Sequence, residues 1–217
     1  MLDKKKVLVE ISSRHIHLSK EHVDVLFGKD YQLKIHKKLS QPEQFAAKEK
    51  VNLVNGDKRI DNIRIVGPER DQTQVELSKT DAVNLNINAP LKISGDLEET
   101  PGIVLEGPKG SVVLEKGVIV AKRHIHVSEE QAEKLGIKDK KYISIRIDGE
   151  KETVFNKLLI RIGPNHNLAV HLDTDEGNAA CINKKTFGEL IKTITNNKNA
   201  KTIYTKKSMV SARNNLF

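Results

Sequence analysis

The sequence of 217 residues predicts a mainly β protein: two small β-barrel domains with short capping helices, related by internal duplication. Three observations lead to this prediction. Short stretches of β-branched or alternating apolar residues recur along the chain, with turn signals such as Asn55-Gly56 between them. Few segments have helical spacing. One histidine motif occurs twice, and other segments repeat around it in the same order.

The repeated motif is Arg-His-Ile-His, followed by an aliphatic residue and a serine, at residues 14–19 and again at residues 123–128. Because residues i and i+2 of a strand point to the same face, each His-x-His pair can present two imidazoles to one metal ion. A single pair of this kind is usually an ordinary polar strand surface. Two copies in the same context predict two equivalent metal-binding halves.

A short helix is predicted after each histidine pair. Ser19 and Ser128 are suitable N-cap residues, and Gln131 completes a capping box in the second copy. Gly28 and Gly136 mark the ends of these two helices. Most of the other strands fall into three predicted hairpins, at residues 51–66, 102–114 and 142–155.

Alignment of the two copies predicts a third ligand for each site. Glu76 and His171 occupy equivalent positions between Val and Leu, and both residue types bind metals. Three protein ligands with an open position are typical of a catalytic zinc site. The alternative, that Glu76 and His171 are ordinary polar strand residues, stays open. The two predicted sites are His15, His17 and Glu76 in the first half, and His124, His126 and His171 in the second.

The net charge of +8 is concentrated at the end of the chain. Residues 184–217 hold eight of the 37 basic residues and only one of the 29 acidic residues. Aromatic content is 4% with no Trp, so aromatic surfaces for stacking nucleic-acid bases are scarce, and no nucleic-acid partner is expected. The spacing of Phe187, Leu190 and Ile194 predicts a final amphipathic helix. The Lys- and Asn-rich residues 192–217 then form a basic, solvated tail.

The expected location is the cytoplasm. No apolar run approaches the roughly 20 residues of a membrane span, so no membrane partner is expected. The first residues lead directly into a predicted strand, without the pattern of a signal peptide. The one cysteine, Cys181, excludes an internal disulfide and fits a reducing compartment. We expect Cys181 to be a small buried residue rather than a nucleophile.

Over residues 6–183 the ordered motifs together resemble the PduL-type phosphotransacylase family, the phosphate propanoyltransferases. The set is long and occurs in one order, which makes the resemblance specific. The motifs are Ser13-Arg14-His15-Ile16-His17-Leu18-Ser19, Leu39-Ser40-Gln41-Pro42 with Gln44-Phe45-Ala46, Gly67-Pro68 with Arg70, Thr73-Gln74-Val75-Glu76, Ser94-Gly95-Asp96, Thr100-Pro101-Gly102, Arg123-His124-Ile125-His126, and His171-Leu172-Asp173-Thr174-Asp175-Glu176 with Asn178-Ala179-Ala180.

The resemblance implies two β-barrels in which the N-terminal strand joins the C-terminal half. The expected domains are residues 1–13 with 122–191, residues 14–121, and the tail 192–217. It also implies two divalent metal ions per chain, usually Zn²⁺, at the six ligands named above. Arg70 is the implied catalytic residue for phosphate. Gln41, Pro42 and Glu43 are the implied contacts to coenzyme A, with Glu43 at a position where the family more often has glycine.

The implied reaction converts a short-chain acyl-CoA, propanoyl-CoA or acetyl-CoA, and phosphate into an acyl phosphate and free coenzyme A. A homodimer is expected, and the lumen of a bacterial microcompartment is the alternative location. No Ser-His-Asp arrangement is evident, which favours direct attack by phosphate over a covalent acyl-enzyme. Two other functions stay open from spacing alone. One is a two-domain cupin-like, metal-dependent oxygenase; the other is a metal-stabilised module that binds nucleic acid through its basic tail.

Overall fold

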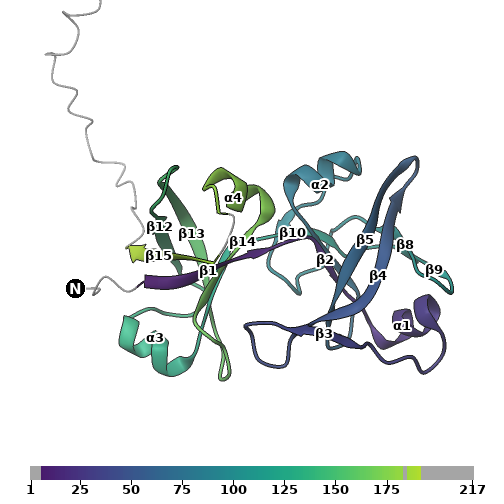
Figure 1. Cartoon of the computed structure of the whole chain (residues 1–217), viewed down its shortest axis with the longest axis horizontal. Coiled ribbons are helices and arrows are strands. Elements are labelled where there is room, and N and C mark those ends of the chain that lie inside the picture. Colours follow the sequence, from purple (N-terminus) through teal and green to yellow (C-terminus); the bar gives the residue numbers. More distant parts are fainter. Residues whose placement is uncertain (1–5, 183–184, 192–217) are drawn as a thin grey trace, which may run out of the picture.

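The computed structural model describes residues 6–182 and 185–191, and within them the chain is mainly β, as predicted (Figure 1). One of its two units is a closed barrel of six strands in the order β1-β14-β11-β13-β12-β15. The predicted tail, residues 192–217, lies outside the described residues. The barrel strands are β1 (Lys6–Ser12), β11 (His124–Val127), β12 (Tyr142–Ile147), β13 (Thr153–Ile162), β14 (Ala169–Asp173) and β15 (Thr186–Ile191).

The second unit is a curled sheet of nine strands, in the order β7-β10-β6-β2-β5-β4-β8-β9 with β3 paired to β4. The two units therefore differ: one closes on itself, whereas the other stays open at β7 and β9 among the described residues. The sheet strands are β2 (His15–His17), β3 (Ile35–Lys38), β4 (Phe45–Asn55), β5 (Lys58–Gly67), β6 (Gln74–Leu77), β7 (Leu91–Lys92), β8 (Ile103–Glu106), β9 (Ser111–Leu114) and β10 (Val118–Ala121).

The two units exchange one strand each. β1 pairs in parallel with β14 and antiparallel with β15, whereas β2, which follows it after two residues, pairs with β5 and β6 in the open sheet. β10 pairs in parallel with β6 and β7, whereas β11, again two residues later, lies in the barrel. The chain thus crosses between the units immediately before each His-x-His pair (Figure 1).

The four helices are short and lie outside the sheets: α1 (Lys20–Phe27), α2 (Lys79–Asn84), α3 (Glu129–Leu135) and α4 (Thr174–Ala179). The predicted caps are confirmed. The Ser19 side chain accepts a hydrogen bond from the His22 N–H, and Ser128 forms a complete capping box with Gln131. No helix among the described residues is long and apolar enough to cross a membrane.

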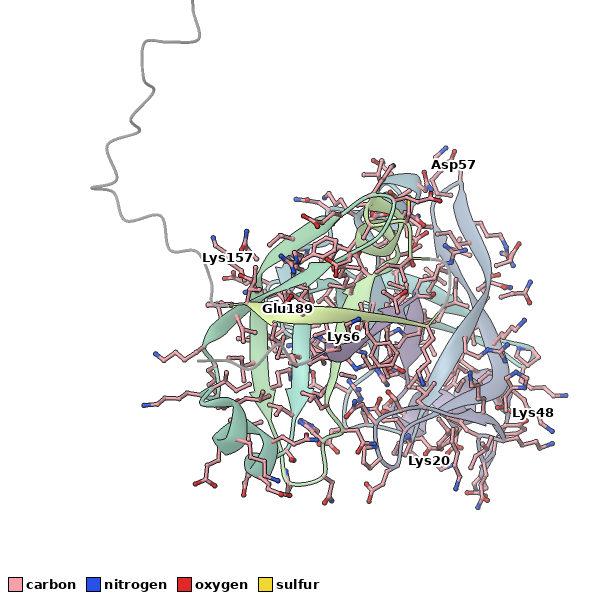
Figure 2. The ribbon with its side chains drawn as sticks, turned by 60° about the vertical axis from the view of Figure 1, so that its left-hand side comes forward. Lys6, Lys20, Lys48, Asp57, Lys157 and Glu189 are labelled. Atoms are coloured by element: carbon pink, nitrogen blue, oxygen red, sulfur yellow. The ribbon has the colours of Figure 1, made fainter. Side chains whose placement is uncertain are left out.

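Each unit encloses its own hydrophobic core, which sets the direction of the histidines. Ile16 and Ile125, the central residues of the two His-x-His pairs, are completely buried in the cores of the sheet and the barrel. Because side chains alternate along a strand, the histidines on either side point to the opposite face, toward the border between the units. Charged side chains such as Lys48 and Lys157 project outward from the molecule (Figure 2).

The three predicted hairpins are confirmed as β4–β5, β8–β9 and β12–β13. The predicted C-terminal helix is wrong: residues 186–191 form β15, because pairing with β1 and β12 satisfies their backbone and places Gly188 and Leu190 in the interior. The prediction that Cys181 is buried is also wrong. It lies in a turn after α4, where its positive φ of 53° and its hydrogen bond to Asn178 leave the side chain exposed.

The packing of α1 against the β8–β9 hairpin can be tested at the turn of that hairpin. A Cβ at Gly107 would lie 2.6 Å from the Leu26 carbonyl oxygen and 2.8 Å from Leu26 Cβ, so Gly107→Ala must push α1 away from the hairpin. We expect a loss of about 1–3 kcal/mol in the free energy of unfolding, measured with urea. Lys109→Ala, an exposed position in the same turn, is the control and should change stability little. Equal stability of the two variants would contradict this packing.

Candidate functional site

The structure brings together the first predicted ligand set at the border between the units. His15 on β2 lies directly opposite Glu76 on β6 in the antiparallel register. The Nε2 atoms of His15 and His17 are 3.2 Å apart. The Glu76 carboxylate oxygens lie 3.7 Å from His15 Nε2 and 3.9 Å from His17 Nε2. Among the described residues these three side chains form a set whose ligand atoms all lie within 4.8 Å of one another.

The tautomers of His15 and His17 follow from the hydrogen bonds that their Nδ1 atoms form. His15 Nδ1 lies 2.8 Å from the Ser13 carbonyl oxygen, and His17 Nδ1 lies 2.9 Å from that of Val66. A carbonyl oxygen can only accept, so each Nδ1 carries a proton, and in the neutral ring, the form that binds metals, the lone pair is then on Nε2. Two unprotonated nitrogens 3.2 Å apart repel each other. A cation between them removes this repulsion, and the donor set therefore fits a metal ion.

The second ligand set lies on equivalent strands, but among the described residues its three ligand atoms do not all lie within 4.8 Å of one another. His124 lies opposite His171 in the register of β11 and β14, and its Nδ1 lies 2.9 Å from the Lys122 carbonyl oxygen. The Nε2 atoms of His124 and His126 are 3.1 Å apart. The His171 ring centroid lies 5.2 Å and 5.0 Å from those of His124 and His126. His171 Nε2 is buried and has no hydrogen-bond partner among the described residues, which fits a nitrogen that can bind a metal ion.

Burial keeps most of these histidines neutral, which is the form that binds metals. It lowers the pKa of His17 and of His124 to about 3, and that of His171 to about 4. Burial also lowers the pKa of His126, to about 2. Burial raises the pKa of Glu76, but attraction to His15 and His17 and a hydrogen bond from Ser94 outweigh it and lower the pKa to about 2.

Two neighbouring side chains orient the Glu76 carboxylate. Gln74 Nε2 and Ser94 Oγ donate hydrogen bonds of 2.5 Å and 2.9 Å to Glu76 Oε1. The side-chain oxygen Oε1 of Gln74 accepts a hydrogen bond of 2.7 Å from the Gly95 N–H, which ties the loop at residues 94–96 to β6. The motif at residues 94–96 was visible in the sequence, but its part in holding Glu76 follows only from the structure.

Arg70 lies at the site as predicted. Its guanidinium donates a 3.3 Å hydrogen bond to Ser94 Oγ, and its backbone N–H bonds to the Leu18 carbonyl oxygen. Burial lowers the pKa of Arg70, attraction to Glu76 raises it, and repulsion from Arg161 lowers it further. Arg70 is therefore a partly buried cation beside Glu76.

The sequence analysis missed Arg161, on β13. Its pKa is lowered by burial and raised by Glu76, and in the described part of the chain no carboxylate lies within ion-pair distance of it. In the sheets Ile160 lies beside Ile125 as Ile65 lies beside Ile16, so the position of Arg161 is taken in the first half by the buried Val66. A half-buried guanidinium without a paired carboxylate favours an anionic ligand.

The loop predicted to contact coenzyme A joins the two units. Gln41 is buried, and its amide donates to the Asn167 carbonyl oxygen at 3.0 Å and accepts from the Asn167 N–H at 3.2 Å. Pro42 and Glu43 are exposed at the tip of this loop. Glu43 has a φ of 64°, a conformation that glycine adopts more easily. Gln41 thus holds the loop in place, and Pro42 and Glu43 are accessible.

The arginine of each repeated motif has a structural role. Arg14 pairs with Asp81 on α2 at 2.7 Å, and Arg123 pairs with Glu176 on α4 at 2.6 Å. Each arginine therefore anchors the helix that follows a ligand strand, β6 or β14. This explains why arginine precedes both histidine pairs.

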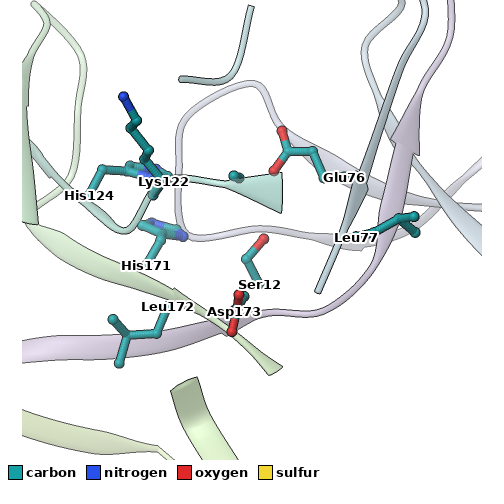
Figure 3. Close-up of a pocket in the computed structure, with 9 residues that line it drawn as sticks. Ser12, Glu76, Leu77, Lys122, His124, His171, Leu172 and Asp173 are labelled. Carbon is teal, nitrogen blue, oxygen red and sulfur yellow. Dashed lines mark hydrogen bonds between the residues drawn. The ribbon is translucent and has the colours of Figure 1, made fainter. Parts of the chain in front are cut away.

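A cavity of about 20 Å³ separates the two ligand sets, enough for one water-sized group. Figure 3 shows Glu76 of the open sheet on one side of this cavity and His124 and His171 of the barrel on the other. The two ligand sets thus face one space. The predicted ligands Glu76 and His171 come from different sequence halves and meet only because the units are in contact.

Comparisons with known proteins identify the family of the chain. A family model described as phosphate propanoyltransferase matches residues 8–183. A phosphate propanoyltransferase of Thermotoga maritima is 48% identical over 178 residues, covering 82% of this chain and 85% of the relative. Those of Alkaliphilus metalliredigens and Listeria monocytogenes are 46% and 44% identical, covering 86% of this chain and 88% and 87% of the relatives. The chain therefore belongs to the phosphate propanoyltransferase family of phosphotransacylase enzymes.

Proposed function

We propose that the protein transfers a short acyl group, propanoyl or acetyl, between coenzyme A and phosphate. The observation that carries this proposal is the border site itself. Glu76 of one ligand set and His124 and His171 of the other line one cavity, and Glu76 raises the pKa of two partly buried guanidiniums, those of Arg70 and Arg161. The reaction needs a polarised thioester carbonyl, a stabilised thiolate and a bound phosphate. Metal ions can polarise the carbonyl and stabilise the thiolate, and arginine can bind the phosphate.

The residues that would hold the metals are the two ligand sets, one ion at each. When bound, two Zn²⁺ ions would polarise the carbonyl and stabilise the leaving thiolate. His15 and His17 hold their Nε2 lone pairs inward through their Nδ1 hydrogen bonds, so the site is oriented before a metal arrives. Gln74 and Ser94 do the same for Glu76.

Arg70 and Arg161 supply the charge for phosphate. A phosphate oxygen attacks the thioester carbon, the carbon–sulfur bond breaks, and the thiolate leaves as coenzyme A. The two guanidiniums offset the repulsion between phosphate and the ionised Glu76 carboxylate, and they hold the nucleophile in attack geometry. We propose that Gln41, Pro42 and Glu43 contact coenzyme A, because their loop spans both units beside this site.

The proposed domains are residues 1–13 with 122–191 and residues 14–121, followed by a basic tail at 192–217. The strand exchange of β1 supports the first boundary. We also propose a homodimer that works in the cytoplasm or, alternatively, in a bacterial microcompartment; the family alone supports these points. A nucleic-acid partner is not proposed, because aromatic residues for stacking bases are scarce and residues 1–183 are close to neutral.

A cupin-like oxygenase is less well supported. In that class a carboxylate near the histidine pair would join the metal, and Glu21 and Glu130 have the closest spacing. Both are exposed, in the first turns of α1 and α3, and Glu130 pairs with Lys134. Neither belongs to the set of ligand atoms that the structure gathers.

The direct test is an assay of thiol release from propanoyl-, acetyl- and butanoyl-CoA with phosphate, before and after metal removal by a chelator. Phosphate-dependent release should occur, fall by at least about tenfold after chelation and return when Zn²⁺ is added, because the ions hold the reacting groups. An acyl-CoA incubation without phosphate is the control. Absence of phosphate-dependent release would reject the proposed function, and chelator-resistant turnover would reject the metal centre.

Metal stoichiometry tests the assignment of two sites. Elemental analysis of the wild type should give two ions per chain, and His17→Ala or His126→Ala should each reduce this to about one, because each removes one ligand of one site only. His36→Ala, an exposed histidine outside both sets, is the matched control. Retention of two ions in both site variants would show that the halves do not form separate sites.

Arg70→Lys and Arg161→Lys test the phosphate contacts. Lys cannot reproduce a bidentate guanidinium contact, so each change should lower kcat/KM for phosphate by about tenfold or more, a loss of at least about 1.4 kcal/mol. The KM for acyl-CoA, the metal content and the Tm should stay near wild type. Normal phosphate kinetics in a variant would remove that arginine from the phosphate site.

A further inference from the structure

The loop that carries Arg70, residues 68–73 between β5 and β6, is tied to the start of α1 at two points. The Arg70 N–H donates a 2.9 Å hydrogen bond to the Leu18 carbonyl oxygen. Further along the loop, the buried Thr73 hydroxyl accepts a 2.9 Å hydrogen bond from the Ser19 N–H. The segment from Arg70 to Thr73 is therefore held at both ends by the two residues that precede α1.

His22, in the first turn of α1, bonds to the same hydroxyl. Its Nδ1 atom lies 2.7 Å from Thr73 Oγ1, while its backbone N–H donates to the N-cap oxygen of Ser19. A threonine hydroxyl can donate one hydrogen bond and accept two, so it can bond His22 and the Ser19 N–H at the same time. Thr73 is thus the point at which the Arg70 loop meets both the cap and the first turn of α1.

The equivalent helix of the barrel is capped without such a link. In α3 the Ser128 N–H donates to the side chain of Gln131, which has the position of His22, so this hydrogen bond stays within the helix. Leu168 precedes β14 as Thr73 precedes β6, and Leu168 packs against the barrel core. A leucine side chain cannot form a hydrogen bond. The open sheet therefore replaces a local capping bond with a long-range bond to the loop that carries Arg70.

The guanidinium of Arg70 depends on its backbone for its position. It donates a hydrogen bond to Ser94 Oγ at 3.3 Å, which is longer than is usual for an N–H···O bond. Displacing a substrate-binding group by about 1 Å can lower a rate by about 100-fold.

We propose that Thr73, held by His22 and by the Ser19 N–H, is a positioning residue of the reaction. It fixes the backbone of the loop at residues 68–73, so that the Arg70 guanidinium stands where phosphate binds. This inference rests on the proposed function, in which Arg70 contacts phosphate.

Steady-state kinetics of the full-length, metal-loaded protein test this role. Thr73→Val keeps the shape of the side chain and removes the hydroxyl. It should lower kcat/KM for phosphate by about tenfold and leave the KM for acyl-CoA and the metal content unchanged, because only the phosphate contact is displaced. Thr73→Ser retains the hydroxyl and should stay within about twofold of the wild type. Gln72→Ala, an exposed position in the same loop, is the control.

His22→Leu removes one of the two partners of the hydroxyl and should lower kcat/KM for phosphate by about threefold or more, again without a change in the KM for acyl-CoA. If Thr73→Val does not fold, His22→Leu decides. Unchanged phosphate kinetics in the folded variants, or an equal loss for phosphate and for acyl-CoA, would overturn the proposal.

A double-mutant cycle shows whether Thr73 acts through Arg70. In an Arg70→Lys background, Thr73→Val should lower kcat/KM for phosphate by less than about twofold, because residues that act as one unit are not additive. The full loss in both backgrounds would contradict a role through Arg70.

Binding of inorganic phosphate, measured by calorimetry, needs no turnover. Thr73→Val should raise the Kd by about tenfold, and Thr73→Ser should not. An inactive wild type with this pattern would reject the proposed reaction and keep the positioning role, whereas an unchanged Kd in Thr73→Val would reject the positioning role.

Discussion

The exchange of β1 and β10 between the two units is the constraint on which the remaining structure depends. β1 forms its backbone hydrogen bonds in the barrel, whereas the next strand, β2, joins the open sheet. β10 forms them in the open sheet, whereas the next strand, β11, joins the barrel. Removing β1 and β10 from these sheets would break the ladders of β1 with β14 and β15 and of β10 with β6 and β7, and would leave their backbone polar groups unpaired. Because only two residues connect β1 to β2 and β10 to β11, the crossing points carry both His-x-His pairs to the same border.

At that border the electrostatics follow from burial and from fixed hydrogen bonds. Neutral imidazoles direct their lone pairs at one another, while their other nitrogens are held by backbone carbonyls. Next to them lie an ionised carboxylate, Glu76, and two partly buried guanidiniums, Arg70 and Arg161. An environment of this kind suits cations between the histidines and an anion at the arginines. Metal ions and phosphate meet both requirements in one space.

The duplication preserved the backbone and changed the side chains that matter chemically. In three equivalent pairs one half has a different chemical group from the other: Glu76 and His171, Val66 and Arg161, and Ile119 and Glu10. The helix anchors were kept, since Arg14 and Arg123 each pair with a carboxylate of the helix after a ligand strand. The scaffold is thus nearly symmetric, whereas the site is asymmetric, as a reaction between two different substrates requires.

The sequence by itself determined the three hairpins, the capped helices and the grouping of His15, His17 and Glu76, because these depend on local periodicity, turn chemistry and repetition along the chain. His15, His17 and Glu76 could be grouped by the period of a strand and by repeat alignment. Only the tertiary structure decided that residues 186–191 form a strand, that Cys181 is exposed, and that Arg161 and Glu10 reach the site. Glu10 lies beside His171 through a parallel pairing of strands far apart in the chain. Local patterns do not record such long-range pairing, which the packing of the whole chain selects.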